Sequence, residues 1–134
     1  MDSQDPWVID SGASDHISGN VSLFSSLSSP KFPHLITLAN GDKVASKGVG
    51  QISVSASLNL ESVLFVPNCP FNLISLSQLT KSLNCSVTFY ADLFVIQEHG
   101  TGQTTGVGHE SRGLYYLETN SSVLFSSPIS QTHS

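Results

Sequence analysis

Charged residues are scarce in this sequence. Lysine and arginine together number five and aspartate and glutamate ten, so charged residues make up 11% of the chain and its net charge is −5. An average soluble domain is roughly a quarter charged. No two basic residues are adjacent, and a nucleic-acid-binding surface needs clustered lysine and arginine. We therefore expect no nucleic-acid binding by this domain alone.

Cysteine and long apolar runs are scarce as well. Cys69 and Cys85 are the only cysteines, and we interpret them as reduced, structural thiols of an intracellular protein. The first five residues are polar and acidic, unlike a signal peptide. No apolar run approaches the ~18 residues of a membrane span. The sequence therefore predicts an intracellular protein that does not bind a membrane.

Short apolar runs separated by turn residues dominate the chain. At 134 residues it has room for one domain. The runs alternate or are continuously apolar over four to six residues at most, which is typical of about eight short strands in a small barrel or sandwich. We predict strands at 7–9, 35–38, 43–45, 51–55, 63–66, 87–90, 93–97 and 113–118.

Three local signals refine this prediction. Asn40-Gly41 between two strand-like runs predicts a hairpin, because both central positions of a type I′ turn need positive φ. The run Val63–Val66 is continuously apolar, which predicts a strand buried on both faces and ended by Pro67. The glycine pairs in 100–102 and 106–108 predict further hairpin turns.

One helix is expected within residues 72–83. Leu76, Leu79 and Leu83 follow helical spacing. Ser75 is the predicted N-cap, and Gln78 three residues later would complete a capping box.

The chemistry is expected at Asp10-Ser11-Gly12, which follows the apolar run 7–9 directly. By itself this tripeptide is also compatible with an Asx-turn at the end of a strand. The segments around it carry more information. In order and spacing they resemble the aspartic protease domain of copia-type retrotransposon polyproteins. The matching segments are 7–17, 36–41, 48–52, 63–67, 71–79 and 112–117.

The resemblance implies an all-β fold, a small closed β-barrel of the retropepsin type with one short α-helix over residues 7–118. Residues 1–6 would form an N-terminal tail and residues 119–134 a Ser/Thr-rich C-terminal tail or linker. It also implies an endopeptidase that processes its own polyprotein at extended peptide segments, inside a cytoplasmic virus-like particle.

A homodimer is implied because each chain supplies one Asp10. Two facing carboxylates share one proton, so that one acts as general base on water while the other polarises the scissile carbonyl. Ser11 would donate its hydroxyl to the partner's loop. Gly12 would allow a tight turn and donate its N–H to the carboxylate.

Further residues are expected to border the substrate. The predicted hairpin, with Asn40, Gly41 and Asp42 near its tip, corresponds in order to the protease flap, although an ordinary surface hairpin fits the pattern too. Ala13 follows the catalytic turn. Leu73, Ile74 and Ser75 correspond to the second half of the active-site scaffold, where the retroviral enzymes have glycine in place of Ser75.

Two other chemistries are disfavoured. Ser14-Asp15-His16 contains the residue types of a serine-hydrolase triad, but neighbours in sequence cannot form that spatial chain of hydrogen bonds. Cys69, Cys85, His99 and His109 lack the close spacing of zinc ligands. We expect neither a metal nor a cofactor.

Two questions stay open from the sequence. Only six residues precede Trp7, whereas retroviral-type proteases have a longer segment there, so the strands after residue 85 either replace that segment or shield an edge of the barrel. The domain is also open to a second interpretation, a catalytically inactive β-barrel module for structure or self-association.

Overall fold

The computed structural model describes residues 6–29, 34–37 and 41–119. These residues contain twelve strands, one α-helix and a single 3-10 turn (Val21–Leu23). In chain order the elements are β1 (Trp7–Asp10), β2 (His16–Ser18), β3 (Phe24–Ser28), β4 (Leu35–Thr37), β5 (Lys43–Ala45), β6 (Gly48–Ser55), β7 (Leu58–Phe65), β8 (Asn72–Ser75), α1 (Leu76–Ser82), β9 (Cys85–Phe89), β10 (Leu93–Glu98), β11 (Thr104–Ser111) and β12 (Leu114–Leu117).

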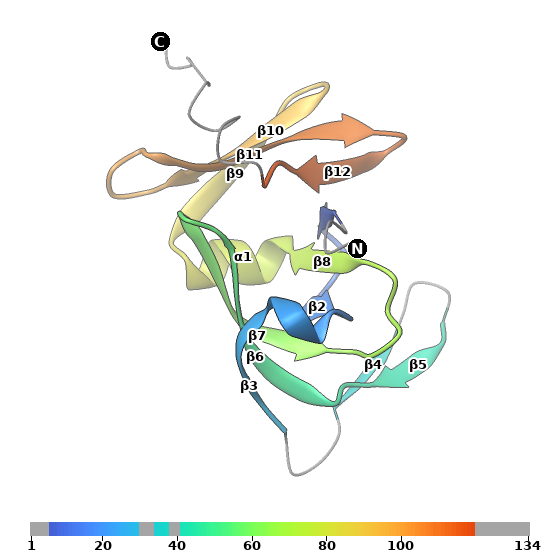
Figure 1. Cartoon of the computed structure of the whole chain (residues 1–134). Helices are drawn as coiled ribbons and strands as arrows, with labels where there is room; N and C mark the ends of the chain where they lie inside the picture. Colours follow the sequence, from blue (N-terminus) through green and yellow to red (C-terminus); the bar gives the residue numbers. More distant parts are fainter. Residues whose placement is uncertain (1–5, 30–33, 38–40, 120–134) are drawn as a thin grey trace.

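Ten strands form one curved sheet in the order β3-β6-β7-β2-β8-β1-β12-β11-β10-β9, and β4 and β5 form a separate hairpin. In Figure 1, β9 to β12 lie above and β3, β6 and β7 below, with β8 and α1 between them. Buried side chains from β6 and β7 meet those from β10 and β12 in one main core. This confirms the predicted all-β barrel with one short helix, whose core is enclosed by packing between the two halves of the sheet.

β1 lies in the middle of this sheet. Trp7, Val8 and Ile9 are all buried. The strand runs parallel to β8, with Asp10 opposite Ser75, and antiparallel to β12, with Trp7 opposite Leu117. The late strand β12 therefore supplies the second neighbour of β1.

The interior divides into two apolar clusters, and β7 contributes to both. Val63 points into the main core, which also holds Trp7 and Ile9, whereas Leu64 belongs to a second cluster. This confirms that the run 63–66 is buried on both faces. The second cluster consists of Ile17, Ile36, Leu64 and Val66, with Val44, Val49, Cys69 and Leu73 packed against it.

The predicted hairpin is present as β4 and β5. Ile36 pairs with Val44, and both contribute to the second cluster, so the base of the hairpin rests on β2 and β7. Gly41 has φ +92, as the predicted turn requires. Asn40 lies outside the described residues.

The prediction for residues 106–108 is wrong, because they belong to strand β11 rather than to a turn. Gly106 and Gly108 are small because large side chains pack over them. A Cβ on Gly108 would lie 2.3 Å from the Phe94 ring, and one on Gly106 2.9 Å from Ile96 Cδ1. The other predicted glycine turn is present, with Gly102 at φ +70.

The predicted helix begins after Ser75, as expected, but the residues before it form a strand of their own. The prediction also missed β2, β3, β8 and β11. β2 is only three residues long, and four of the five residues of β3 are exposed, so neither carries a clear apolar period.

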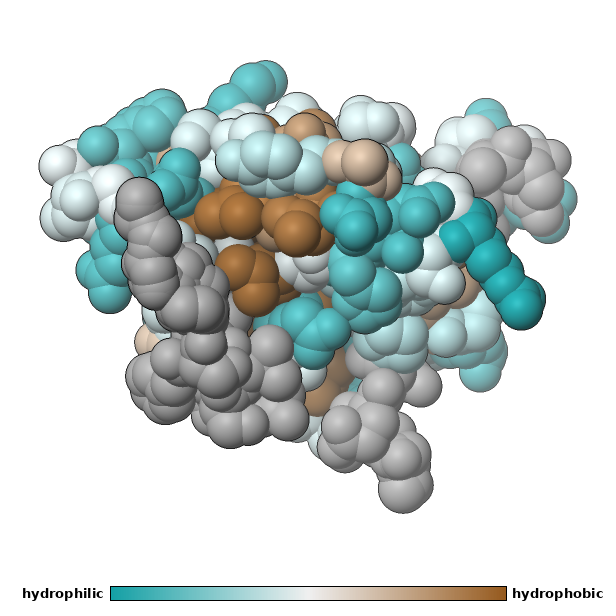
Figure 2. All heavy atoms as spheres, turned by 90° about the horizontal axis from the view of Figure 1, so that it is seen from above, coloured by the Kyte–Doolittle hydropathy of each residue, from teal (hydrophilic) through white to brown (hydrophobic). Residues whose placement is uncertain are grey.

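Seen from above in Figure 2, apolar side chains gather in the middle of the face and hydrophilic ones surround them. Within the described residues, no helix is long and apolar enough to cross a membrane.

Candidate active site

Asp10 is the last residue of β1 and is half-buried. Its carboxylate oxygen Oδ1 accepts a hydrogen bond from the Gly12 N–H at 2.8 Å, as the sequence predicted. The Ala13 N–H donates to the Asp10 carbonyl at 3.4 Å and closes the turn. Because the strand below is buried and paired on both sides, the carboxylate is held at the end of a rigid support.

The loop after Asp10 crosses the end of β8. β1 and β2 are consecutive in the chain, yet β8 lies between them in the sheet. The loop 11–15 must therefore pass over the carboxyl end of β8, where α1 begins. Ser75, the last residue of β8, lies beneath this loop and is completely buried.

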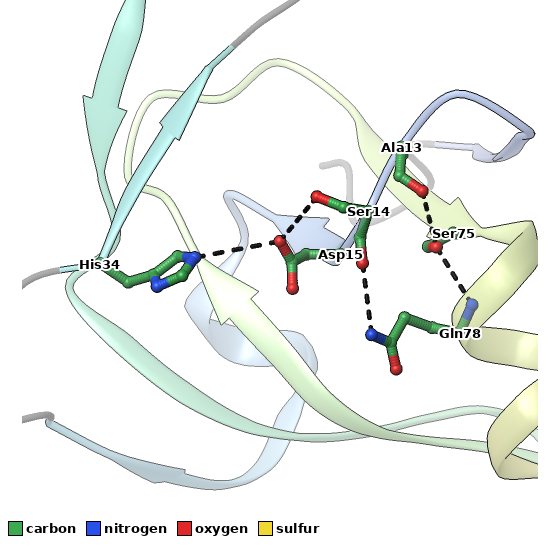
Figure 3. A network of polar contacts seen from close by, with 6 residues as sticks. All are labelled: Ala13, Ser14, Asp15, His34, Ser75 and Gln78. Atoms are coloured by element: carbon green, nitrogen blue, oxygen red, sulfur yellow. Dashed lines mark hydrogen bonds and ion pairs between the residues drawn. The ribbon is translucent and has the colours of Figure 1, made fainter.

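Besides a contact between its hydroxyl and that of Ser77 at 3.2 Å, Ser75 makes three hydrogen bonds at this place, and two of them hold the loop. Its hydroxyl donates to the Ala13 carbonyl at 2.8 Å, and its N–H donates to His16 Nδ1 at 3.0 Å. The same hydroxyl accepts the Gln78 N–H at 3.2 Å and so caps α1. Figure 3 shows the Ser75 side chain between Ala13 and the first turn of the helix.

The predicted capping box is only half formed. The cap itself is confirmed, but the Gln78 side chain does not return to the Ser75 N–H, which is bonded to His16 instead. Gln78 Nε2 donates to the Ser14 carbonyl at 3.3 Å (Figure 3). The first turn of α1 is therefore tied to the loop at two points, Ala13 and Ser14.

His16 is 3% exposed. Burial lowers its pKa from 6.5 to about 4, although the nearby Asp15 carboxylate acts in the opposite direction. The ring is therefore neutral at neutral and mildly acidic pH, and Nδ1 carries the lone pair that accepts the Ser75 N–H.

A second buried hydrogen bond joins β2 to β8. These strands share a single pair in register, Ile17 with Leu73. Ser18 Oγ donates to Asn72 Oδ1 at 2.6 Å on one side of this pair, and the His16 bond to Ser75 lies on the other. Two buried side-chain hydrogen bonds thus help connect β2 to β8, whereas other strand pairs of the sheet are connected by longer backbone ladders.

The base of the β4–β5 hairpin lies beside the loop. Asp15 Oδ2 accepts the Ser14 hydroxyl at 3.1 Å and lies 4.0 Å from His34 Nε2 (Figure 3). Because His16 bonds to Ser75 rather than to Asp15 or Ser14, these three consecutive residues do not form a hydrolase triad.

The residues predicted for catalysis lie together at the end of β1. Ser11 and Gly12 are exposed beside Asp10, so they are open to a partner chain. Gly12 lies outside the left-handed φ region, and a Cβ there would make an ordinary contact, 3.4 Å from Asp10 Oδ1. Gly12 contributes to the site through its N–H, which donates to the Asp10 carboxylate.

The residues predicted to border substrate divide into two groups. Ala13, Gly41 and Asp42 are partly or fully exposed. Ile74 and Ser75 are completely buried, so a direct substrate contact by either side chain does not fit this structure. Leu73 is half-buried against the second cluster. Residues 73–75 thus support the loop from below, as a scaffold does.

Sequence reasoning missed Ser18 and Asn72 as parts of the site. Their polarity was visible, but a polar residue in a short segment is exposed far more often than buried. Only the crossing of the loop over β8 brings them together. Within the described parts of the chain, no group of three or more histidine, cysteine, aspartate or glutamate side chains is placed to hold a metal ion.

Fold and site together define a small β-barrel domain with one Asp-Ser-Gly turn at the end of a central strand. The chain belongs to the family described as Pol polyprotein, beta-barrel domain, whose model matches residues 7–83. It is 34% identical to the retrovirus-related Pol polyprotein from transposon RE1 of Arabidopsis thaliana over 98% of this chain and 10% of that protein.

The retrovirus-related Pol polyprotein from transposon RE2 of the same plant is also 34% identical, over 96% of this chain and 9% of that protein. The chain thus spans about a tenth of the length of these relatives and is a retrotransposon Pol polyprotein β-barrel domain. No solved structure matches it.

Proposed function

We propose that this domain is an aspartic endopeptidase that cleaves its own polyprotein as a homodimer. The observation that supports this proposal most strongly is the geometry of the turn. Asp10 ends a central buried strand, and its Oδ1 accepts the Gly12 N–H at 2.8 Å. The exposed residues Ser11 and Gly12 adjoin it. The turn thus presents a general base on a rigid support.

The mechanism needs two chains. Asp10 is the carboxylate of this turn, and a dyad requires a second carboxylate close enough to share a proton. A two-fold axis beside the turn would bring the partner's Asp10 to it. The ionised member then takes a proton from a water that attacks the peptide carbonyl, and the protonated member donates to the carbonyl oxygen.

The substrate is an extended peptide of the polyprotein. The β4–β5 hairpin rests on the second cluster and lies beside the loop through His34 and Asp15. A hairpin in this position can close over a bound strand and offer backbone hydrogen bonds to it.

Asp10→Asn tests the proposal. The chain fused to its own flanking polyprotein segments should cleave at mildly acidic pH, and the variant should lose cleavage entirely while keeping its fold. Asp92→Asn is the matched control, because Asp92 is an exposed carboxylate in the β9–β10 turn and should leave cleavage unchanged. Cleavage that survives Asp10→Asn would contradict the proposal and favour the inactive barrel module.

A further inference from the structure

One buried polar side chain beside Asp10 has no part in the dyad chemistry. His16 begins β2 at the far end of the loop, and its Nδ1 accepts the Ser75 N–H at 3.0 Å. We propose that His16 and Ser75 are a positioning pair, which holds the loop over β8 and thereby sets where the Asp10 carboxylate meets that of the partner. This inference rests on the proposed function.

The pair acts on the loop from both of its ends. At the near end, Asp10 lies opposite Ser75 in the parallel ladder between β1 and β8. At the far end, the His16 ring is bonded to the N–H of the same Ser75. In the middle, the Ser75 hydroxyl donates to the Ala13 carbonyl. One buried residue therefore contacts the start, the middle and the end of the catalytic loop.

The arrangement needs an acceptor on His16. A backbone N–H can only donate, so Nδ1 must carry a lone pair and the ring proton must be on Nε2. A protonated imidazole has two N–H donors and no acceptor, so protonation would break the bond to Ser75.

Burial keeps His16 Nδ1 able to accept a hydrogen bond at the mildly acidic pH at which a shared-proton dyad operates. A histidine with its ordinary pKa of 6.5 would be largely protonated at mildly acidic pH, whereas the pKa of His16 is about 4. Asp15 is the charged group that raises it, and Asp15 itself faces His34 at 4.0 Å. The buried ring therefore stays neutral in the pH range of the proposed reaction.

Two substitutions of similar branched shape separate the effect of the hydrogen-bond acceptor from that of side-chain shape. His16→Asn places a carbonyl oxygen near the position of Nδ1, and His16→Leu has the same branching as Asn without an acceptor. Cleavage of the flanking polyprotein segments should be measured for the full chain with each substitution. We expect kcat of His16→Asn to stay within about threefold of the original chain, and kcat of His16→Leu to fall about tenfold to a hundredfold with little change in KM.

A spectroscopic measurement supports the same inference without activity. Long-range nitrogen–proton correlation NMR of the original chain at pH 6 should show His16 neutral, with its proton on Nε2. Because this measurement uses the original chain, it tests the inference even if His16→Leu does not fold.

The outcomes are distinct. Equal kcat values for folded His16→Asn and His16→Leu would overturn the positioning role, as would a proton on Nδ1 at pH 6. If the original chain cleaves nothing, the proposed function fails and the catalytic role of the pair fails with it. If the original chain cleaves and the two variants do not differ, only the positioning role fails.

Discussion

The surroundings of β1 differ on its two sides. On the β8 side lie four buried polar residues, His16, Ser18, Asn72 and Ser75, whose two hydrogen bonds join β8 to β2. On the β12 side the contacts are apolar and aromatic: Leu117 is in the main core, and the Tyr115 ring packs edge-on against Phe89 at 4.8 Å and Phe94 at 6.0 Å between ring centroids.

This difference separates positioning from stability. Buried hydrogen bonds are directional and specify one arrangement, whereas apolar packing stabilises in proportion to burial and tolerates replacements of similar volume. The family model ends at residue 83, so it includes the polar β8 side and excludes β12. Changes on the β12 side should therefore affect stability alone, whereas changes on the β8 side should also affect the geometry of Asp10.

The largest expected effect is on the β12 side. In Gly108→Ala the new Cβ would lie 2.2 Å from the Tyr116 carbonyl oxygen and 2.3 Å from the Phe94 ring. Because backbone is one of the two obstacles, the strand must shift, and we expect a loss of about 3 kcal/mol or more in the free energy of unfolding. Urea denaturation measures this loss. Gly100→Ala is the control, since nothing lies within 4 Å of its Cβ, and an equal loss there would contradict the packing explanation.

Acid should weaken the β8 side. The pKa of His16 is about 4 in the folded chain and 6.5 in the unfolded chain, so the unfolded state binds a proton first as the pH falls. The contribution of His16 is complete above pH 6.5 and declines between 6.5 and 4, by about 3 kcal/mol. Urea denaturation at pH 7 and pH 4 should show a smaller loss for His16→Asn than for the original chain. Equal losses would mean that other groups cause the acid sensitivity.

Ser75→Ala should cost about 1–2 kcal/mol, because it removes the helix cap and the donor to the Ala13 carbonyl. We expect kcat for polyprotein cleavage to fall more than this loss of stability explains, since the loop is released in its middle. Ser26→Ala on the exposed strand β3 is the control and should change neither quantity. Loss of stability with an unchanged kcat would contradict the difference between the two sides of β1.

The smallest expected effect is that of Tyr115→Leu. It removes two edge contacts between rings and should cost about 1 kcal/mol in urea denaturation. Cleavage should be unchanged for the folded fraction, in contrast to Ser75→Ala with a similar loss of stability. A large fall in kcat here would show that the β12 side also positions Asp10.

The sequence predicted the parts of this domain that depend on local patterns. Strand β1, the β4–β5 hairpin, the strand buried on both faces and the Ser75 cap follow from apolar periodicity and turn chemistry, and the Gly12 N–H bond to Asp10 follows from the tripeptide. These features involve residues that are close in the chain, where sequence patterns are most informative.

What the sequence did not predict depends on residues far apart in the chain. The bond from Ser75 to His16 spans 59 positions and that from Ser18 to Asn72 spans 54. Only the order β2-β8-β1 brings these residues together. The glycines of β11 were misinterpreted for the same reason, because the Phe94 ring that requires Gly108 to be small belongs to another strand.

The most direct test of the central claim, that Asp10 is half of an active site, is a subunit-mixing measurement. The original chain and Asp10→Asn would be mixed and allowed to exchange at constant total concentration, and cleavage measured against the fraction of original chain. If each dimer needs two Asp10 carboxylates, activity follows the square of that fraction, so an equal mixture retains about a quarter of the full rate. A linear dependence, with about half the rate in an equal mixture, would contradict the claim.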